Sequence, residues 1–161
     1  MPSLAKTRLF ATLLCLALPA SLSAAPSEPL RVIWIPDADT IHVISPAQNK
    51  VKVRFAGIDC PESDQPWGKE STAFLQQRIR GQSVTLEITE TDRYGRAIAR
   101  VYHQGENLNR WLVQHGHCWT YSRYAKGTEL FELEAEAKRQ GLGLWALPEP
   151  DRIPPWEWRR R

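Results

Sequence analysis

Apolar and polar residues alternate along two stretches of the chain, as they do in β-strands that bury one face. In the first stretch, apolar and β-branched residues cluster over residues 31–35 and 41–44 and alternate with charged residues over 51–55. In the second, the alternation over 84–88 stops at a polar turn and resumes over 97–102. The pattern therefore predicts five strands, three antiparallel ones followed by a second hairpin.

Three further segments carry apolar residues at helical spacing. The first covers residues 69–79 and the second 107–115, and each is followed by a glycine within two positions. The third begins after Thr128, whose side chain is expected to cap it, and stops at Gly141. Three strands, a helix, two strands and two helices in this order predict a small α+β domain, a five-stranded OB-fold β-barrel with three α-helices.

The composition fits one compact domain and argues against several classes of protein. Of the 161 residues, 42% are hydrophobic and 24% are charged, which is unlike a disordered chain, a collagen or a coiled coil. The formal net charge is only +3, so the protein lacks the strong positive field of a histone-like neutraliser of nucleic acid. Any contact with a polyanion must therefore be local.

The N-terminal residues have the pattern of a secretory signal peptide. Lys6 and Arg8 precede an apolar run over 9–18, which is ended by Pro19 and a set of small residues. The run is about half of the roughly 20 residues that a membrane-spanning helix needs, so we expect cleavage and no membrane anchor afterwards. These features predict a signal peptide over 1–23 and an exported protein, either periplasmic or secreted into the medium.

The rest of the chain divides into a domain over 24–147 and a C-terminal tail over 148–161 that is rich in Pro, Trp and Arg. We expect the prolines of the tail to prevent a helix, Trp156 and Trp158 to cover the barrel, and the terminal arginines to be solvated. Cleavage of the signal peptide removes two basic and no acidic residues, which lowers the formal net charge to +1. The mature protein is expected to be a nearly neutral monomer.

Two cysteines, Cys60 and Cys118, remain after this cleavage. In an oxidising compartment such a pair is usually bridged, so a disulfide is the default expectation and two buried reduced thiols are the alternative. His115, His117 and Cys118 also lie close together in the sequence and, with Cys60, invite comparison with a zinc site. Their spacing fits no common zinc template, so we do not expect one.

The charged residues that could carry chemistry lie at strand ends and turns, where a scaffold can hold them and solvent can reach them. They are Asp39, Arg54, Asp59, Glu62 and Arg96. Each alone would be an ordinary solvated side chain, but together they combine carboxylates with guanidinium groups. Such a set suits phosphodiester cleavage, because a carboxylate-bound hard cation and the planar forks of arginine stabilise the charge that builds on phosphorus.

Several motifs around these residues follow one another over residues 31–145. They are Asp37-Ala38-Asp39-Thr40, Val53-Arg54-Phe55-Ala56-Gly57-Ile58-Asp59-Cys60-Pro61-Glu62, Gln65-Pro66-Trp67-Gly68, Thr91-Asp92-Arg93-Tyr94-Gly95-Arg96, residues 109–116 and Gly143-Leu144-Trp145. With these motifs in register, the chain resembles the staphylococcal nuclease (thermonuclease) family. The resemblance implies an OB-fold enzyme, a calcium-dependent phosphodiesterase that hydrolyses DNA and RNA with little sequence preference and leaves 3′-phosphate ends.

By this resemblance, Asp39 and Asp59 match the two carboxylates that bind Ca²⁺, and Cys60 matches the position whose backbone carbonyl completes the protein ligands. Two positions depart from the family pattern. Ala38 replaces the glycine that is usual between the two aspartates, so this turn either has an ordinary φ here or is strained. Cys60 replaces a threonine, and its side chain is free to reach Cys118, in which case the bridge would brace the active-site loop.

The same resemblance matches Arg54 and Arg96 to the arginines that hold the phosphate and stabilise the transition state. Glu62 matches the general base, which either takes the proton of the attacking water or positions that water. Four residues match contacts to the substrate: Arg93, Tyr94, Tyr121 and Tyr124. The alternative from another class is a noncatalytic OB-fold module that binds nucleic acid or a protein partner, and the full set of charged residues argues against it.

Overall fold

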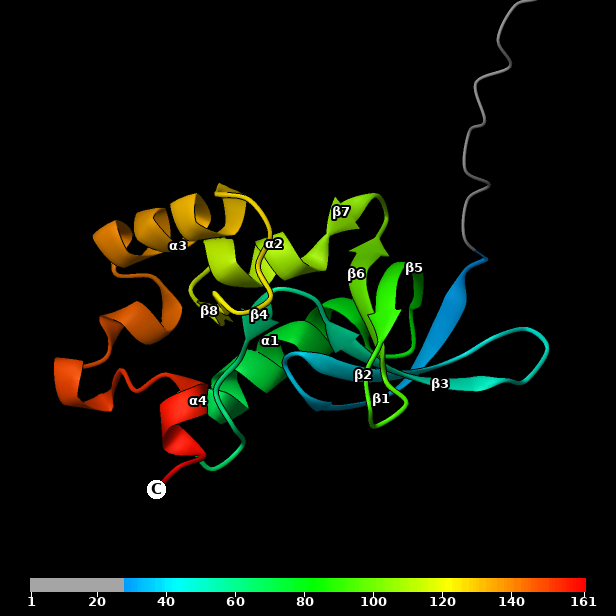
Figure 1. The fold of residues 1–161 in the computed structure, drawn as a ribbon, viewed down its shortest axis with the longest axis horizontal. Helices are drawn as coiled ribbons and strands as arrows, with labels where there is room; N and C mark the ends of the chain where they lie inside the picture. The colour runs from blue at the N-terminus through cyan, green and yellow to red at the C-terminus, as the bar shows by residue number, and fades with distance from the viewer. Residues whose placement is uncertain (1–27) are drawn as a thin grey trace, which may run out of the picture.

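The computed structural model describes residues 28–161, so the predicted signal peptide lies outside the described residues (Figure 1). A β-barrel occupies one half of the molecule, and the helices and the C-terminal segment occupy the other half. Within the described residues, no helix is long and apolar enough to cross a membrane.

The barrel strands are β1 (Leu30–Asp37), β2 (Thr40–Ile44), β3 (Lys50–Phe55), β5 (Ser83–Thr91) and β6 (Ala97–His103). Neighbours pair antiparallel in the order β3-β2-β1-β5-β6, and a parallel pairing of β3 with β6 closes the sheet on itself. The predicted five-stranded OB-fold barrel is therefore confirmed. The closing pair could not be predicted, because alternation indicates which face of a strand is buried and not which strand lies beside it.

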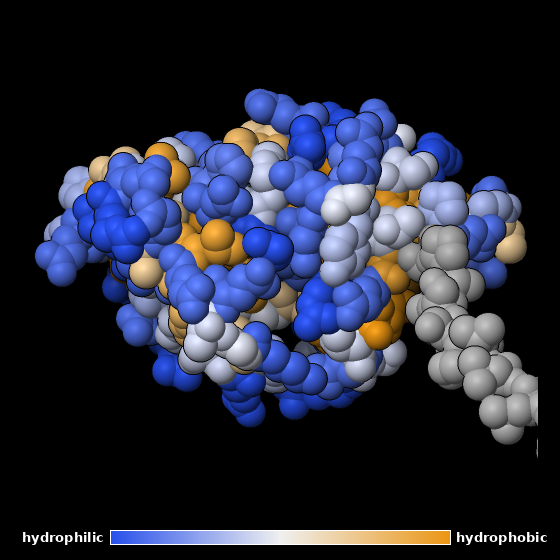
Figure 2. All heavy atoms as spheres, turned by 90° about the horizontal axis from the view of Figure 1, so that it is seen from above, coloured by the Kyte–Doolittle hydropathy of each residue, from blue (hydrophilic) through white to orange (hydrophobic). Residues whose placement is uncertain are grey.

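The alternation that predicted the strands is an alternation of burial in the structure. In β6 every second residue faces the interior, and Ala99 and Val101 are fully buried. They share one apolar core with Val53 and Phe55 of β3 and with the buried side of α1 (Gly68–Ile79). On the face shown in Figure 2, hydrophilic residues cover most of the surface and hydrophobic ones form small patches between them.

The helices follow the predicted segments closely. Besides α1 they are α2 (Leu108–Gln114) and α3 (Glu129–Gln140). Asn107 caps α2, since its side-chain oxygen accepts a hydrogen bond from the backbone N–H of Arg110 at 3.2 Å. The predicted cap of α3 is wrong, because the hydroxyl of Thr128 makes no capping hydrogen bond and the backbone of this residue is already helical.

Short elements complete the described part of the fold. The extended ones are β4 (Ile58–Asp59), which pairs antiparallel with β8 (Trp119–Thr120), and β7 (Glu106–Asn107), which pairs with β6. The helical ones after α3 are η1 (Gly143–Ala146), η2 (Glu149–Asp151) and α4 (Pro155–Trp158). Sequence reasoning missed all six, because elements of two to four residues are too short to show a period.

Two expectations for the tail are wrong. Its last turn is helical, since α4 begins at Pro155, and proline suits the first position of a helix because the N–H that it lacks would have no partner there. The tail also does not cover the barrel. It lies beside the start of α1 and the segment around β4 and β8 (Figure 1), where Trp156 contacts the rings of Trp119 and Tyr121.

The expected bridge between Cys60 and Cys118 is present in the structure. Cys60 directly follows β4, Cys118 directly precedes β8, and both residues are buried. The disulfide therefore ties together the two strands of the small sheet. Its sulfur atoms are not free to bind zinc, and among residues 28–161 no group of three or more His, Cys, Asp or Glu side chains is placed to hold a metal ion.

Replacing both Cys60 and Cys118 with Ala is expected to lower the free energy of unfolding by about 4 kcal/mol, because the unfolded chain regains the entropy that a bridge of this span removes. Urea denaturation of the oxidised parent and of the double variant at one pH measures the difference. Equal midpoints with equal slopes would contradict the prediction.

Candidate active site

Three charged side chains, one from a turn and two from different strands, converge at one end of the barrel. Asp39 lies in the turn between β1 and β2, Arg54 lies in β3, and Asp59 lies in β4. The Nη2 atom of Arg54 is 3.1 Å from Oδ2 of Asp39 and 2.9 Å from Oδ1 of Asp59. Antiparallel pairing of Thr40 with Arg54 sets this register and brings the turn to the end of β3. Two carboxylates therefore share one cationic nitrogen.

The guanidinium of Arg54 is also fixed by the backbone. Its Nη1 atom donates hydrogen bonds to the carbonyls of Phe55 and Ile58, each at 2.9 Å, across the turn between β3 and β4. Gly57 in this turn has a φ of 74°, and a Cβ atom there would lie 3.1 Å from a methyl group of Leu130. The turn therefore favours glycine, and the orientation of Arg54 is set without a ligand.

The turn that carries Asp39 is unstrained at Ala38. Among the non-glycine residues of the described part, positive φ occurs at Gln48, Trp67 and Gln104, and Ala38 is not one of them. Ala38 is completely buried and belongs to the apolar core. The turn with Ala38 in place of glycine was expected to be either strained or ordinary in φ, and the structure shows an ordinary φ.

Burial shapes the chemistry of both carboxylates, since Asp39 is 6% and Asp59 is 1% exposed. Burial raises the pKa of Asp39 to about 6, against the opposing effect of the nearby Arg54 guanidinium. The pKa of Asp59 is also raised by burial, although hydrogen bonds from Arg159 oppose the shift. Oδ2 of Asp39 additionally accepts a hydrogen bond from the backbone N–H of Cys60 at 2.7 Å. Further positive charge beside these carboxylates would stabilise their ionised forms.

Glu62 lies on the loop that leads from the disulfide to α1. Its backbone N–H donates to Oε1 of Gln65 at 3.1 Å, and its carbonyl accepts from the backbone N–H of Gln65 at 2.9 Å. A Cβ atom on Gly68 would lie 1.8 Å from that carbonyl oxygen, so glycine is required at the start of α1. Trp67 before it has a φ of 72°, which is unusual for a bulky residue. Packing therefore imposes the shape of this loop, a role of Gly68 that sequence reasoning missed.

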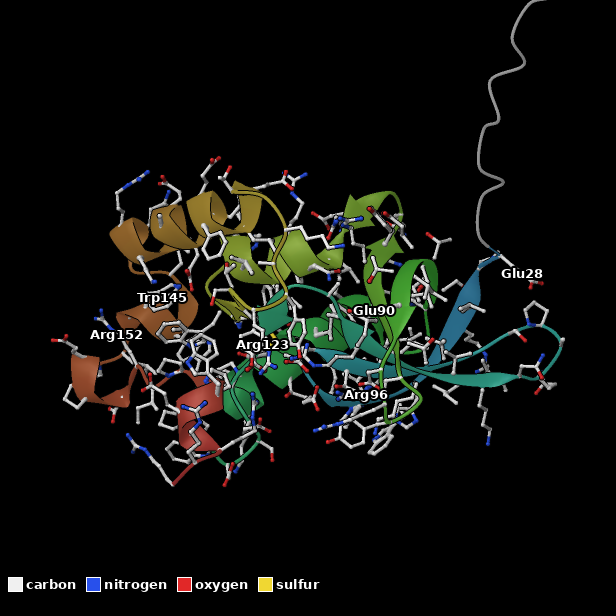
Figure 3. All side chains as sticks on the ribbon, in the orientation of Figure 1. Glu28, Glu90, Arg96, Arg123, Trp145 and Arg152 are labelled. Atoms are coloured by element: carbon white, nitrogen blue, oxygen red, sulfur yellow. A yellow bond between two sulfur atoms is a disulfide. The ribbon has the colours of Figure 1, made fainter. Side chains whose placement is uncertain are left out.

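Arg93, Tyr94 and Arg96 form a second cluster at the β5–β6 hairpin, where Figure 3 labels Arg96. The guanidinium carbons of Arg93 and Arg96 lie 4.9 Å and 5.7 Å from the centroid of the Tyr94 ring. The ion pair of Arg96, at 2.7 Å, is with Asp92 of the same turn. β6 runs parallel beside β3, which carries Arg54, yet within residues 28–161 no ion pair joins Arg96 to the carboxylates at the barrel end.

Tyr121 and Tyr124 follow β8 and lie beside the β3–β4 turn. The backbone N–H of Tyr121 donates to the carbonyl of Gly57 at 2.9 Å, and the two tyrosine rings are 5.2 Å apart. Arg123 between them, labelled in Figure 3, has its guanidinium carbon 5.8 Å from the Tyr124 ring. The structure thus brings this pair to the turn that orients Arg54.

Arg159 of the tail completes the cluster, although it was expected to be solvated. One of its nitrogens, Nη2, lies 2.7 Å from Oδ2 of Asp59, and Nη1 lies 2.6 Å from Oε1 of Glu62. These ion pairs raise the pKa of Arg159 further. Sequence reasoning missed this residue because a run of three terminal arginines has the same appearance whether its members are solvated or paired.

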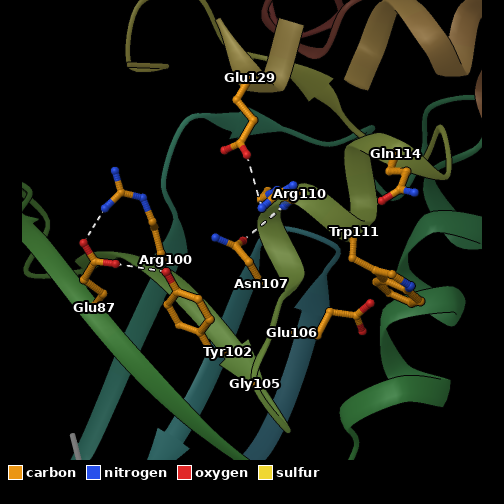
Figure 4. Close-up of a pocket in the computed structure, with 10 residues that line it drawn as sticks. All are labelled: Glu87, Arg100, Tyr102, Gly105, Glu106, Asn107, Arg110, Trp111, Gln114 and Glu129. Carbon is orange, nitrogen blue, oxygen red and sulfur yellow. Dashed lines mark hydrogen bonds and ion pairs between the residues drawn. The ribbon is translucent and has the colours of Figure 1, made fainter. Parts of the chain in front are cut away.

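A hollow of about 550 Å³ lies elsewhere, between the β5–β6 sheet edge and α2 (Figure 4). Four of its five charged residues pair with one another, Arg100 with Glu87 and Arg110 with Glu129, and the fifth, Glu106, pairs with Arg78 outside the hollow. None of the candidate site residues lines it. The hollow is therefore not part of the candidate site.

The donor set at the barrel end fits a hard divalent cation better than zinc. Asp39 and Asp59 supply oxygen atoms that converge on one nitrogen, and hard cations prefer oxygen ligands. Two carboxylates do not complete a coordination shell, so the remaining ligands would be backbone carbonyls such as that of Cys60, water or substrate oxygens. A cation there would also offset the unfavourable burial of the two carboxylates.

Asp39 is expected to make the free energy of unfolding depend on pH in the absence of divalent cations. Its pKa is about 6 in the folded protein and near the ordinary value of 3.8 in the unfolded chain. The folded state therefore keeps a proton that the unfolded chain has lost, and the free energy of unfolding falls as pH rises from about 4 to about 6.

The variant Asp39→Asn removes this contribution and is expected to be more stable than the parent at pH 7, by about 1–3 kcal/mol. Its pH dependence will be shallower and not flat, because the raised pKa of Asp59 acts in the same direction. Chemical denaturation in a chelator at several pH values measures both slopes. The same slope in parent and variant would contradict the assignment.

Comparison with known proteins gives a consistent result. Residues 52–147 match the family described as staphylococcal nuclease homologues. An uncharacterized endonuclease of Escherichia coli is 38% identical over 132 residues, which cover 81% of this chain and 84% of the relative. The micrococcal nuclease of Shigella flexneri is 40% identical over 141 residues, covering 81% of this chain and 79% of the relative. A staphylococcal-like nuclease of Arabidopsis thaliana is 37% identical over 111 residues, which cover 69% of this chain and 34% of the relative. The chain belongs to the staphylococcal nuclease family.

Proposed function

We propose that this protein is a calcium-dependent nuclease that hydrolyses phosphodiester bonds of DNA and RNA with little sequence preference and leaves 3′-phosphate ends. Membership of the family and relatives named as nucleases make it a nuclease. The charges of the site support a cation and phosphodiester chemistry, whereas the choice of substrates and the 3′-phosphate ends rest on the family resemblance. The observation that carries it is the convergence of Asp39, Arg54, Asp59 and Glu62 at one end of the barrel. Solvated surface charges would have no reason to meet there.

In this proposal Asp39, Asp59 and the backbone carbonyl of Cys60 hold the calcium ion. Oxygen donors and buried negative charge support this choice, as does the raised pKa of Asp39, which a nearby cation would lower. When bound, calcium supplies positive charge next to the phosphoryl oxygens and lowers the cost of the extra charge on phosphorus. The small sheet and the disulfide fix Asp59 and Cys60, and the hydrogen bond from the backbone N–H of Cys60 ties Asp39 to them.

Arg54 and Arg96 bind the phosphoryl oxygens of the substrate. The planar fork of a guanidinium matches two oxygens at once, and Arg54 is already oriented by two backbone carbonyls. Arg96 approaches from the β5–β6 hairpin and exchanges its ion pair with Asp92 for the phosphate. The two guanidiniums stabilise the charge that the transition state adds.

Glu62 handles the attacking water. Its half-buried carboxylate either accepts the proton that the water loses or orients the water toward phosphorus, and both roles need the loop geometry that Gly68 permits. Arg93 and Tyr94 contact a terminal phosphate of the bound strand, and Tyr121 and Tyr124 stack on a base. The exposure of Tyr94 and Tyr124 supports these contacts.

We also propose that the mature protein is an exported monomer without a membrane anchor, in the periplasm or the medium. The Cys60–Cys118 disulfide supports export, because such bonds persist in oxidising compartments.

Cleavage of single- and double-stranded DNA and of RNA, with calcium and then with excess chelator, tests the proposed function. We expect hydrolysis of all three substrates with calcium, no hydrolysis with chelator, and fragments that carry 3′-phosphate groups. Binding of nucleic acid without any cleavage in calcium would support the noncatalytic OB-fold module and contradict the proposal.

Single variants assign the roles of the charged residues. Arg54→Gln, Arg96→Gln and Glu62→Gln are each expected to slow turnover by about 100-fold or more, because each removes an interaction made in the transition state. Arg100→Gln is the matched control. Arg100 lies in β6, which begins directly after Arg96, and it pairs with Glu87 away from the site. Steady-state cleavage rates at saturating calcium measure the effects. An Arg96→Gln enzyme with the full rate would remove Arg96 from the proposed machinery.

A further inference from the structure

The C-terminal tail contacts the loop that carries Glu62 at several points. The amide nitrogen of Gln65 donates a hydrogen bond to the carbonyl of Ile153, and the indole N–H of Trp158 donates to Oδ1 of Asp64 at 3.2 Å. Both acceptor and donor on the loop lie within three residues of Glu62. The tail therefore rests on the segment that positions the proposed water-handling residue.

The next contact places an aromatic ring where a nucleobase is proposed to bind. Trp156 lies on Tyr121 with ring centroids 5.3 Å apart and an interplanar angle of 19°, which is the arrangement of a stacked pair. Stacking of a base on an aromatic side chain has the same geometry and is worth a comparable amount. Trp156 and a base therefore cannot occupy this face of Tyr121 together.

Arg159 makes the most direct contact with the site. Its guanidinium bridges Asp59 and Glu62, a proposed cation ligand and the proposed water-handling group. The two carboxylates are thereby partly neutralised by a group of charge +1, which donates hydrogen bonds to the oxygens that a divalent cation would need. Arg54 is held by hydrogen bonds to two backbone carbonyls, which Arg159 lacks, so Arg159 is the cation that can leave.

The tail is built to detach. α4 has only four residues, and the side chains of Arg159 and Glu62 are 44% and 35% exposed, so water can solvate both groups when the tail leaves; the pair with Asp59, whose side chain is 2% exposed, is the stronger restraint. Arg160 and Arg161 add positive charge at the same end, which draws the free tail back toward an acidic site and toward nucleic acid.

We propose that residues 153–161 form an autoinhibitory strap, in which Arg159 stands in for the cation and Trp156 for a base, and that calcium and nucleic acid displace it. The inference rests on the proposed function of the site. It means that the apparent calcium affinity equals the affinity of the open form multiplied by the fraction of molecules in which the strap is open.

Isothermal titration of the purified protein with calcium, at fixed ionic strength, tests the strap. Arg159→Gln is expected to bind calcium about fivefold more tightly than the parent, as loss of a partly exposed ion pair would give. Arg160→Gln is the matched control, because it removes the same charge from the neighbouring position and Arg160 has no ion pair in the described part of the chain. Its affinity is expected to stay within about twofold of the parent.

Fluorine NMR gives a readout that does not depend on catalysis. In protein labelled with 5-fluorotryptophan, the signals of Trp156 and Trp158, assigned with single Trp→Phe variants, are expected to shift during the calcium titration of the parent. In Arg159→Gln they should start closer to their final positions. Unchanged thermal unfolding of Arg159→Gln would verify that the variant is folded.

The results of these experiments distinguish failure of the strap proposal from failure of the proposed nuclease function. Equal calcium affinities for Arg159→Gln and Arg160→Gln, in proteins that cleave nucleic acid, would overturn the strap and leave the nuclease intact. A loss of turnover of about tenfold or more in Arg159→Gln at saturating calcium would also overturn it, because the guanidinium would then act in the reaction. Absence of both calcium binding and cleavage in the parent would remove the proposed function, and the strap with it.

Discussion

The guanidinium of Arg54 holds two buried carboxylates from separate parts of the chain, and the rest of the site is arranged around this shared ion pair. Asp39 and Asp59 reach one nitrogen of Arg54, while the other nitrogen is anchored on backbone carbonyls. The strand ladder and the glycine turn at Gly57 set that geometry before any ligand arrives. Backbone architecture thus fixes Arg54 and its two carboxylates in place, whereas the proposed function needs Arg96 and Arg159 to exchange their present ion pairs.

Such a cluster is costly to fold, because burial raises the pKa of both aspartates even though Arg54 pairs with both of them and Arg159 pairs with Asp59. The stability must come from elsewhere in the molecule. The barrel core supplies most of it, and the Cys60–Cys118 disulfide braces the chain directly beside Asp59. Under the proposed function, binding of a cation would relieve a cost that folding has already incurred.

Strand and helix positions could be predicted from the sequence because alternation and helical spacing report which face is buried. Asp39, Arg54 and Asp59 could be singled out as well, since they lie at strand ends and in motifs with a family order. Contacts between distant parts of the chain could not be predicted from the sequence. The β3–β6 pairing depends on how the barrel closes, and the ion pairs of Arg159 depend on where the tail packs against the domain. The need for Gly68 likewise appears only when the loop and helix are packed together.

The most direct test of the account is a crystal structure of the protein with calcium and a short phosphorothioate oligonucleotide. The account predicts one cation bound to Asp39 and Asp59, a phosphoryl group on Arg54 with Arg96 brought to it, and Arg159 withdrawn from Asp59. A cation bound elsewhere, with the nucleic acid on another face of the barrel and the ion pairs of Arg54 and Arg159 unchanged, would contradict it.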